Sequence, residues 1–201
     1  MSDPSKYLSH FYIIACRGRC CDLNENSRPP LHVHEYPSTC MSDISGSRYC
    51  TWRPLGSIFL SLCKNENGNT IVHTLLNGES YYASECVMLP ASIRAGVTVL
   101  GQYVEDMEKG TGKLEPRILI FDTLDNGADT KTFCHVRDRY QFLLDHFQHL
   151  NIHDSILRLQ WVGEYSGSRI ISSGQMQLPH DVKSILLLDD VSPYSIEEQD
   201  I

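Results

Sequence analysis

The sequence predicts an α+β domain built on an antiparallel sheet. Short apolar runs separated by turn-forming residues follow one another from residue 48 to residue 124, which is typical of consecutive strands. One amphipathic segment and one further apolar run, at 184–188, come after them. No strand–glycine-rich loop–helix unit is present, which excludes dinucleotide-binding and P-loop folds.

Taken in order, residues 7–16 read as a first strand or short helix, and the polar, proline-containing stretch 22–47 reads as a loop. The strands expected next are 48–52, 57–63, 70–76, 81–89, 97–105 and 117–124. The dipeptide Asn67-Gly68 between two of these runs predicts a tight turn and therefore an antiparallel meander. Apolar residues at helical spacing predict an amphipathic helix over 136–150.

The length of 201 residues and the 41% apolar content predict one domain over 1–190, followed by an acidic, frayed tail over 191–201. No apolar run reaches the ~18 residues of a membrane span, so we expect no membrane partner. The N-terminus lacks the pattern of a secretory signal, so we expect eight reduced cysteines and a cytoplasmic or nuclear location.

The charge balance limits the class of ligand. The 17 basic and 25 acidic residues give a net charge of −8, which argues against a broad grip on long double-stranded nucleic acid. A nucleotide or a short RNA end held in one local pocket is compatible with this charge.

Two groups of residues could in principle supply metal ligands. They are Cys16, Cys20, Cys21, His32 and His34 in one group, and His146, His149 and His153 in the other. The first group contains no Cys-x-x-Cys pair, and the second is explained by a solvated helix face. We therefore predict no metal and no cofactor.

Three sequence blocks follow one another along the chain and carry a family resemblance through their order. They are DISGSRYCTW at 43–52, VLGQYVED at 99–106 with EPRILIFDTL at 115–124, and HVRDRYQFL at 135–143. Over 36–188 this order resembles the nucleotidyltransferase fold of mRNA capping guanylyltransferases and of their non-catalytic, snurportin-like cap-binding relatives. The resemblance implies a capping-enzyme-like antiparallel-sheet domain without an OB-fold lid.

The active family carries the signature Lys-x-Asp-Gly-x-Arg, whose lysine forms a covalent lysyl–nucleotide intermediate. The matching hexapeptide here keeps Gly46 and Arg48 but has Asp43 in place of the nucleophile. A carboxylate repels a triphosphate and cannot form that bond, so the resemblance implies a pseudoenzyme with no catalytic residue.

Later motifs of the family are altered as well. Its Asp-Gly-Glu strand falls on Gly101-Gln102-Tyr103, and its next acidic residue, followed by glycine and an apolar strand, falls on Lys183-Ser184. No Lys-x-Lys motif follows residue 190 in this sequence. The resemblance therefore implies that the fold is kept and the reaction is lost.

Several residues have both a ligand-binding and a purely structural interpretation. Trp52 either stacks on a methylated guanine or packs in the core, and Arg48 either binds phosphate or forms a surface ion pair. Tyr103 and Glu105 share one side of a strand, which faces either the cleft or solvent. Asp122 either meets a ribose hydroxyl or caps a turn. The full predicted ligand-binding set is Asp43, Gly46, Arg48, Trp52, Tyr103, Glu105, Asp122 and Lys183.

Three functions follow from these observations. The first is an inactive, RNA-binding domain that takes an RNA 5′ cap or guanine nucleotide. The second is a protein-interaction module on the same fold, with a protein partner and no nucleotide. The third is a divergent active guanylyltransferase in which Lys64 or Lys113 replaces the missing nucleophile.

Overall fold

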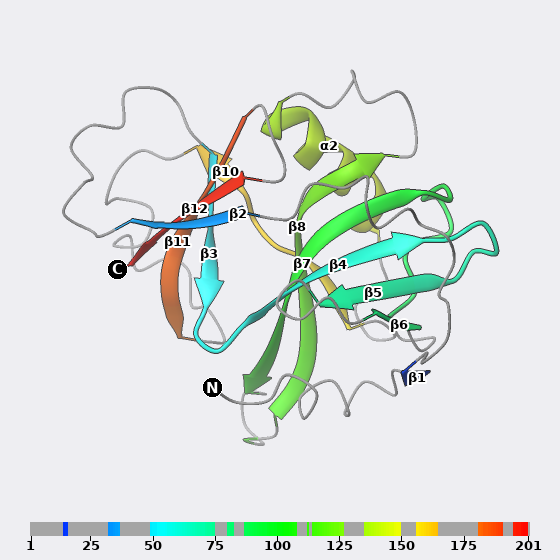
Figure 1. The fold of residues 1–201 in the computed structure, drawn as a ribbon, viewed down its shortest axis with the longest axis horizontal. Helices are drawn as coiled ribbons and strands as arrows, with labels where there is room; N and C mark the ends of the chain where they lie inside the picture. The colour runs from blue at the N-terminus through cyan, green and yellow to red at the C-terminus, as the bar shows by residue number, and fades with distance from the viewer. Residues whose placement is uncertain are drawn as a thin grey trace.

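The computed structural model describes residues 14–15, 32–36, 49–74, 80–82, 87–107, 112, 114–126, 135–149, 156–164, 181–190 and 195–200. These residues form two β-sheets and the helix α2 (Figure 1). The predicted α+β class is confirmed.

The larger sheet has seven strands in the order β1-β6-β5-β4-β7-β8-β9. In that order they are β1 (Ile14–Ala15), β6 (Ser80–Tyr82), β5 (Thr70–Thr74), β4 (Ile58–Lys64), β7 (Val97–Met107), β8 (Leu114–Asn126) and β9 (Leu157–Leu159). All neighbours in this sheet are antiparallel except β8 and β9, which are parallel.

The smaller sheet has five strands in the order β10-β3-β11-β12-β2. They are β10 (Gly163–Glu164), β3 (Tyr49–Pro54), β11 (Val182–Leu188), β12 (Ser195–Asp200) and β2 (His32–Tyr36). Only β12 and β2 pair in parallel. The segment from β9 to β10 passes from one sheet to the other, so the two sheets meet where it crosses.

The predicted meander of β4, β5 and β6 is confirmed, and its first turn shows why. Gly68 takes a positive φ of 80°, a conformation that glycine adopts without the Cβ clash of other residues. Its N–H donates to the Asn65 carbonyl over 3.0 Å. The Asn65 side chain in turn accepts from the N–H of Asn69 over 2.9 Å, so the turn satisfies its own polar groups.

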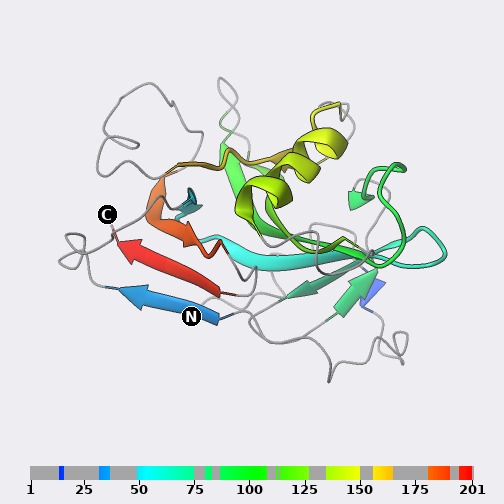
Figure 2. The same ribbon diagram turned by 90° about the horizontal axis from the view of Figure 1, so that it is seen from above.

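The helix α2 (Val136–Phe147) packs on one face of the larger sheet, as Figure 2 shows. Its buried residues are spaced three or four apart: Val136, Arg139, Leu143 and Phe147. The predicted amphipathic helix is confirmed, although it ends at Phe147. A second apolar cluster on the other face of the larger sheet includes Phe59, Phe121, Leu186 and Leu188 and joins the two sheets.

The structure corrects three sequence predictions and adds two strands. The tail predicted to be frayed contains β12, and the loop predicted over 22–47 contains β2. The strand predicted over 81–89 ends with β6 at Tyr82, while Val87 and Leu89 pack in the core outside any ladder. The strands β9 and β10 were not predicted. The polar strand β12 forms because its backbone pairs with β11 on one side and with β2 on the other. Backbone hydrogen bonds of this kind require no apolar pattern in the sequence.

Two of the eight cysteines lie where the structure describes side chains. Both Cys50 and Cys63 are free and buried, as expected for reduced thiols. Burial raises the pKa of Cys50 to about 12, which leaves little reactive thiolate at neutral pH. No helix within the described ranges is long and apolar enough to cross a membrane.

Candidate functional site

Five of the eight predicted ligand-binding residues are described, and these five do not converge in one place. Asp43, Gly46 and Arg48 lie outside the described residues. Of the others, Trp52 lies on β3 at the junction of the sheets, and Lys183 lies half-buried near the start of β11. The remaining three, Tyr103, Glu105 and Asp122, lie on the central strands β7 and β8.

The junction holds a pair of tryptophans, one from β3 and one from the segment that connects the two sheets. The rings of Trp52 and Trp161 are nearly parallel, with an interplanar angle of 15° and 6.4 Å between centroids. Trp161 lies in the segment from β9 to β10 and is 36% exposed, while Trp52 is half-buried. A Cβ on Gly163 would overlap the Trp161 ring, so the absence of a side chain there gives the indole its position.

Buried amides fix the backbone beneath this pair. The Trp52 carbonyl accepts from Gln102 Nε2 at 3.0 Å and from Gln160 Nε2 at 2.6 Å. Gln102 Nε2 also donates to Gln160 Oε1 at 3.1 Å, and Ser57 Oγ donates to Gln102 Oε1 at 3.1 Å. Sequence reasoning missed both glutamines. The available signal was an amide side chain within an otherwise apolar run.

Tyr103 lies in the core rather than at a surface. Its side chain is 2% exposed and belongs to the apolar cluster between the larger sheet and α2. Its hydroxyl donates to Glu105 Oε1 at 3.2 Å, which agrees with the prediction that the two residues share one side of β7. Since both faces of the phenol ring are packed, Trp161 is the aromatic residue that accompanies Trp52.

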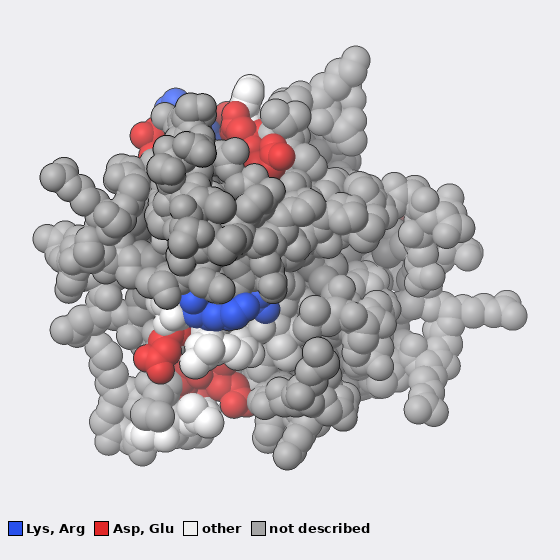
Figure 3. Space-filling model, turned by 60° about the vertical axis from the view of Figure 1, so that its left-hand side comes forward, with Lys and Arg blue, Asp and Glu red and all other residues white. Residues whose placement is uncertain are grey.

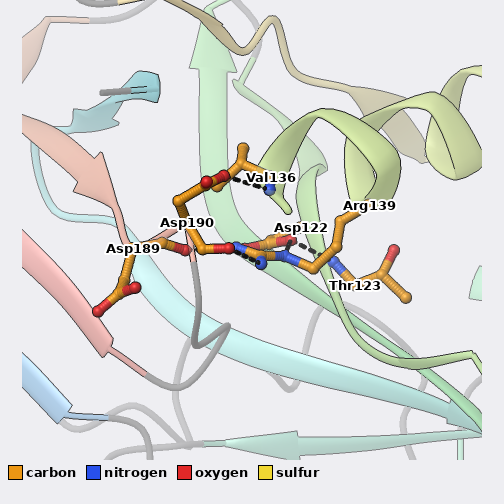
Figure 4. A network of polar contacts seen from close by, with 6 residues as sticks. All are labelled: Asp122, Thr123, Val136, Arg139, Asp189 and Asp190. Atoms are coloured by element: carbon orange, nitrogen blue, oxygen red, sulfur yellow. Dashed lines mark hydrogen bonds and ion pairs between the residues drawn. The ribbon is translucent and has the colours of Figure 1, made fainter. Parts of the chain in front are cut away.

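Asp122 forms a buried ion pair with Arg139, drawn in Figure 4. Arg139 donates through Nε at 2.8 Å and through Nη2 at 3.2 Å to the two carboxylate oxygens. The N–H of Thr123 donates to the same carboxylate at 2.7 Å. Burial raises the pKa of Asp122, against the opposing effect of the guanidinium charge and these hydrogen bonds. The Thr123 contact resembles the predicted turn cap, but the principal partner of Asp122 is Arg139.

The same arginine reaches the smaller sheet. Its Nη2 donates to the Asp189 carbonyl at 2.8 Å and its Nη1 to the Asp190 carbonyl at 3.4 Å, just after β11 (Figure 4). The Asp190 carboxylate accepts from the N–H of Val136 at 2.9 Å and contacts His135 Nδ1 at 2.8 Å. This network ties β8, the N-terminus of α2 and the end of β11 together.

Replacing Asp190 by asparagine is expected to remove a pH-dependent part of the stability. Partial burial opposes ionisation, but the contacts with His135 and Val136 outweigh it and hold the pKa of Asp190 below its ordinary value. A lowered folded-state pKa gives stability that is present above the ordinary value of 3.8 and is lost as the pH falls through the folded-state pKa.

Urea unfolding of wild type and Asp190→Asn from about pH 5 to about pH 2 tests this expectation. The difference in unfolding free energy between the two proteins should shrink as the pH falls. A difference that stays constant over that range would contradict it.

Lys64 is held in a structural role. Its ammonium donates to the carbonyls of Pro90 at 2.9 Å and Ala91 at 3.5 Å, and the residue is buried. Both contacts direct the Lys64 side chain at backbone carbonyls. Lys113, the other lysine that could replace the nucleophile, lies outside the described residues.

The described surface shows charges of both signs. On the face in Figure 3, acidic side chains form two groups, and basic side chains lie beside each of them. Where side chains are described, no cluster of three histidine, cysteine or carboxylate groups could hold a metal ion.

Comparison with models of known protein families finds no match for this chain. Comparison with curated proteins likewise finds no matching relative. A functional proposal must therefore rest on the residues and on the geometry described above.

Proposed function

We propose that this chain is a catalytically inactive domain of the nucleotidyltransferase type that binds an RNA 5′ cap or a guanine nucleotide. The observation that carries this proposal is the pair of Trp52 and Trp161, near-parallel and partly exposed at the junction of the two sheets. Methylation gives guanine a delocalised positive charge, which an aromatic face attracts by about 1–2 kcal/mol. Stacking on indole rings is also a common way to bind single nucleobases.

Two features support the absence of catalysis. Asp43 occupies the position at which the resembling enzymes have their nucleophilic lysine. Lys64, the described alternative, donates its ammonium to two backbone carbonyls and is buried. We therefore expect no covalent nucleotide adduct on this chain.

Titration with 7-methylguanosine triphosphate and with GTP, followed by NMR chemical shifts, tests the binding. We expect micromolar or weaker affinity, with the methylated ligand preferred about fivefold to thirtyfold. Trp161→Ala should remove most of this preference, because it deletes the more exposed ring of the pair.

Tyr103→Phe is the matched control, since it alters a buried aromatic residue without removing its ring. It should leave both affinities unchanged. If the wild-type protein shows no shift with either ligand at millimolar concentration, the nucleotide proposal is wrong.

The second candidate is a protein-interaction module on the same fold. The net charge of −8 favours it, because acidic surroundings weaken the binding of polyphosphates. Partly exposed tryptophans are also frequent anchors of protein interfaces. A protein partner whose binding is lost in Trp161→Ala, together with no response to either nucleotide, would select this function.

A further inference from the structure

We infer that Gln102 and Gln160 are positioning residues that set the distance and angle between the indoles of Trp52 and Trp161. The inference rests on the proposed function for its effect on ligand binding, but its geometric part can be tested without any ligand.

The two tryptophan-bearing segments are joined by reciprocal side-chain contacts. The Gln160 amide donates to the Trp52 carbonyl, and the Thr51 hydroxyl donates to the Trp161 carbonyl at 2.8 Å. Each donor is the immediate chain neighbour of the tryptophan on its own segment. The pair of contacts therefore fixes the position of one tryptophan backbone relative to the other.

Gln102 connects these two tryptophan-bearing segments to the centre of the larger sheet. It lies on β7, paired with Phe59 of β4 on one side and Leu119 of β8 on the other, and its side chain is fully buried. Its Nε2 donates both to the Trp52 carbonyl and to Gln160 Oε1. A rigid central strand thus holds both sides of the junction.

The contacts specify one orientation of the Gln102 amide. Its two N–H donors are used by Trp52 and Gln160, and its oxygen accepts from Ser57. A rotation by half a turn would place its oxygen against two other acceptors and leave the Ser57 hydroxyl without an acceptor. A buried network in which every amide group is hydrogen-bonded is costly to rearrange, so it holds the two indoles at a fixed separation.

A purely structural role would couple the tryptophan geometry to global stability, whereas a positioning role separates the two. Replacing one glutamine by methionine leaves buried polar groups of the other glutamine without hydrogen-bond partners, which lowers the free energy of unfolding. Replacing both glutamines removes most of these unpaired polar groups and restores part of the free energy of unfolding. The double variant still lacks both glutamine donors to the Trp52 carbonyl, so the indole geometry stays lost.

Far-UV circular dichroism of the full chain tests this, because two near-parallel indoles give an exciton couplet that depends on their distance and angle. Trp52→Phe and Trp161→Phe assign the couplet. We expect Gln160→Met and the double variant Gln102→Met/Gln160→Met to lose most of its amplitude. The double variant should be less destabilised than the sum of its single variants. Ser57→Ala, which changes the same network without contacting either indole backbone, should retain the couplet.

The double variant decides the case if a single variant fails to fold. A couplet lost from a double variant that still unfolds cooperatively supports the inference, and a couplet of wild-type amplitude overturns it. In the titration with nucleotides, Gln160→Met should remove most of the preference for 7-methylguanosine triphosphate over GTP. Absence of binding by the wild-type protein would end the proposed function, while the couplet alone would still decide the positioning role.

Discussion

Arg139→Met is expected to lower the free energy of unfolding by about 3–5 kcal/mol, because it leaves a buried carboxylate without its counter-ion. Both members of the Asp122–Arg139 pair are buried, and the arginine also donates to two backbone carbonyls that follow β11. Methionine keeps much of the side-chain volume but supplies no donor. Urea denaturation at pH 7 measures the loss.

Arg137→Met is the matched control, since Arg137 is exposed on the same helix turn. It should change stability by less than about 0.5 kcal/mol. Equal effects of the two substitutions would show that the buried pair contributes nothing beyond an ordinary surface charge. In Asp122→Leu/Arg139→Met, which removes both charges, a large part of the stability should return.

The pH dependence of Arg139→Met has a definite sign. Without the guanidinium, burial raises the pKa of Asp122 further, so the folded state takes up a proton at a pH where the unfolded state does not. A raised folded-state pKa means that the variant gains stability as the pH falls from 7 toward about 4. The difference between wild type and variant should therefore narrow over that interval.

Gly101→Ala is expected to destabilise the larger sheet by about 1–3 kcal/mol through overpacking. A Cβ at this position would lie 3.0 Å from Ile118 Cγ2, 3.0 Å from Ile120 Cδ1 and 3.3 Å from the Leu119 carbonyl oxygen. All of these atoms belong to β8, which lies beside Gly101 in the ladder. Chemical denaturation measures the cost.

Ile120→Val provides the compensating change, because valine lacks the Cδ1 atom that a new methyl group would meet. The double variant Gly101→Ala/Ile120→Val should be more stable than the sum of the single effects predicts. Strict additivity would show that the crowding at Ile120 is not the source of the loss.

The apolar strands and the helix were predictable because each carries its own pattern. The Asn67-Gly68 turn fixed the meander, and apolar spacing located α2 to within a few residues. The strands β2 and β12 carry no such pattern, since their ladder bonds are made by backbone groups that every sequence provides. The pairing of β2 with β12 joins strands far apart along the chain, which local periodicity does not reveal.

The site was predictable only in part for a similar reason. Trp52 was identified from its residue type and its position on a strand. Side chains alternate between the two faces of a strand, but this alternation does not tell which face of β7 lies in the core. The sequence therefore could not predict that Tyr103 is buried. Arg139 lies on the buried face of α2, where the apolar spacing of the helix predicts no charged residue. Its partner Asp122 lies on a different element, and only the tertiary packing joins them.

The parallel pairing of β2 with β12 bears on the order in which the chain assembles during synthesis. Residues 32–36 leave the ribosome long before residues 195–200 exist, so in the described fold their ladder partner is the last to be made. The ladder from β4 to β8, whose strands follow closely in sequence, can close while synthesis continues. A nascent chain stalled after residue 164 would therefore hold the central strands of the larger sheet, while β3 would still await β11.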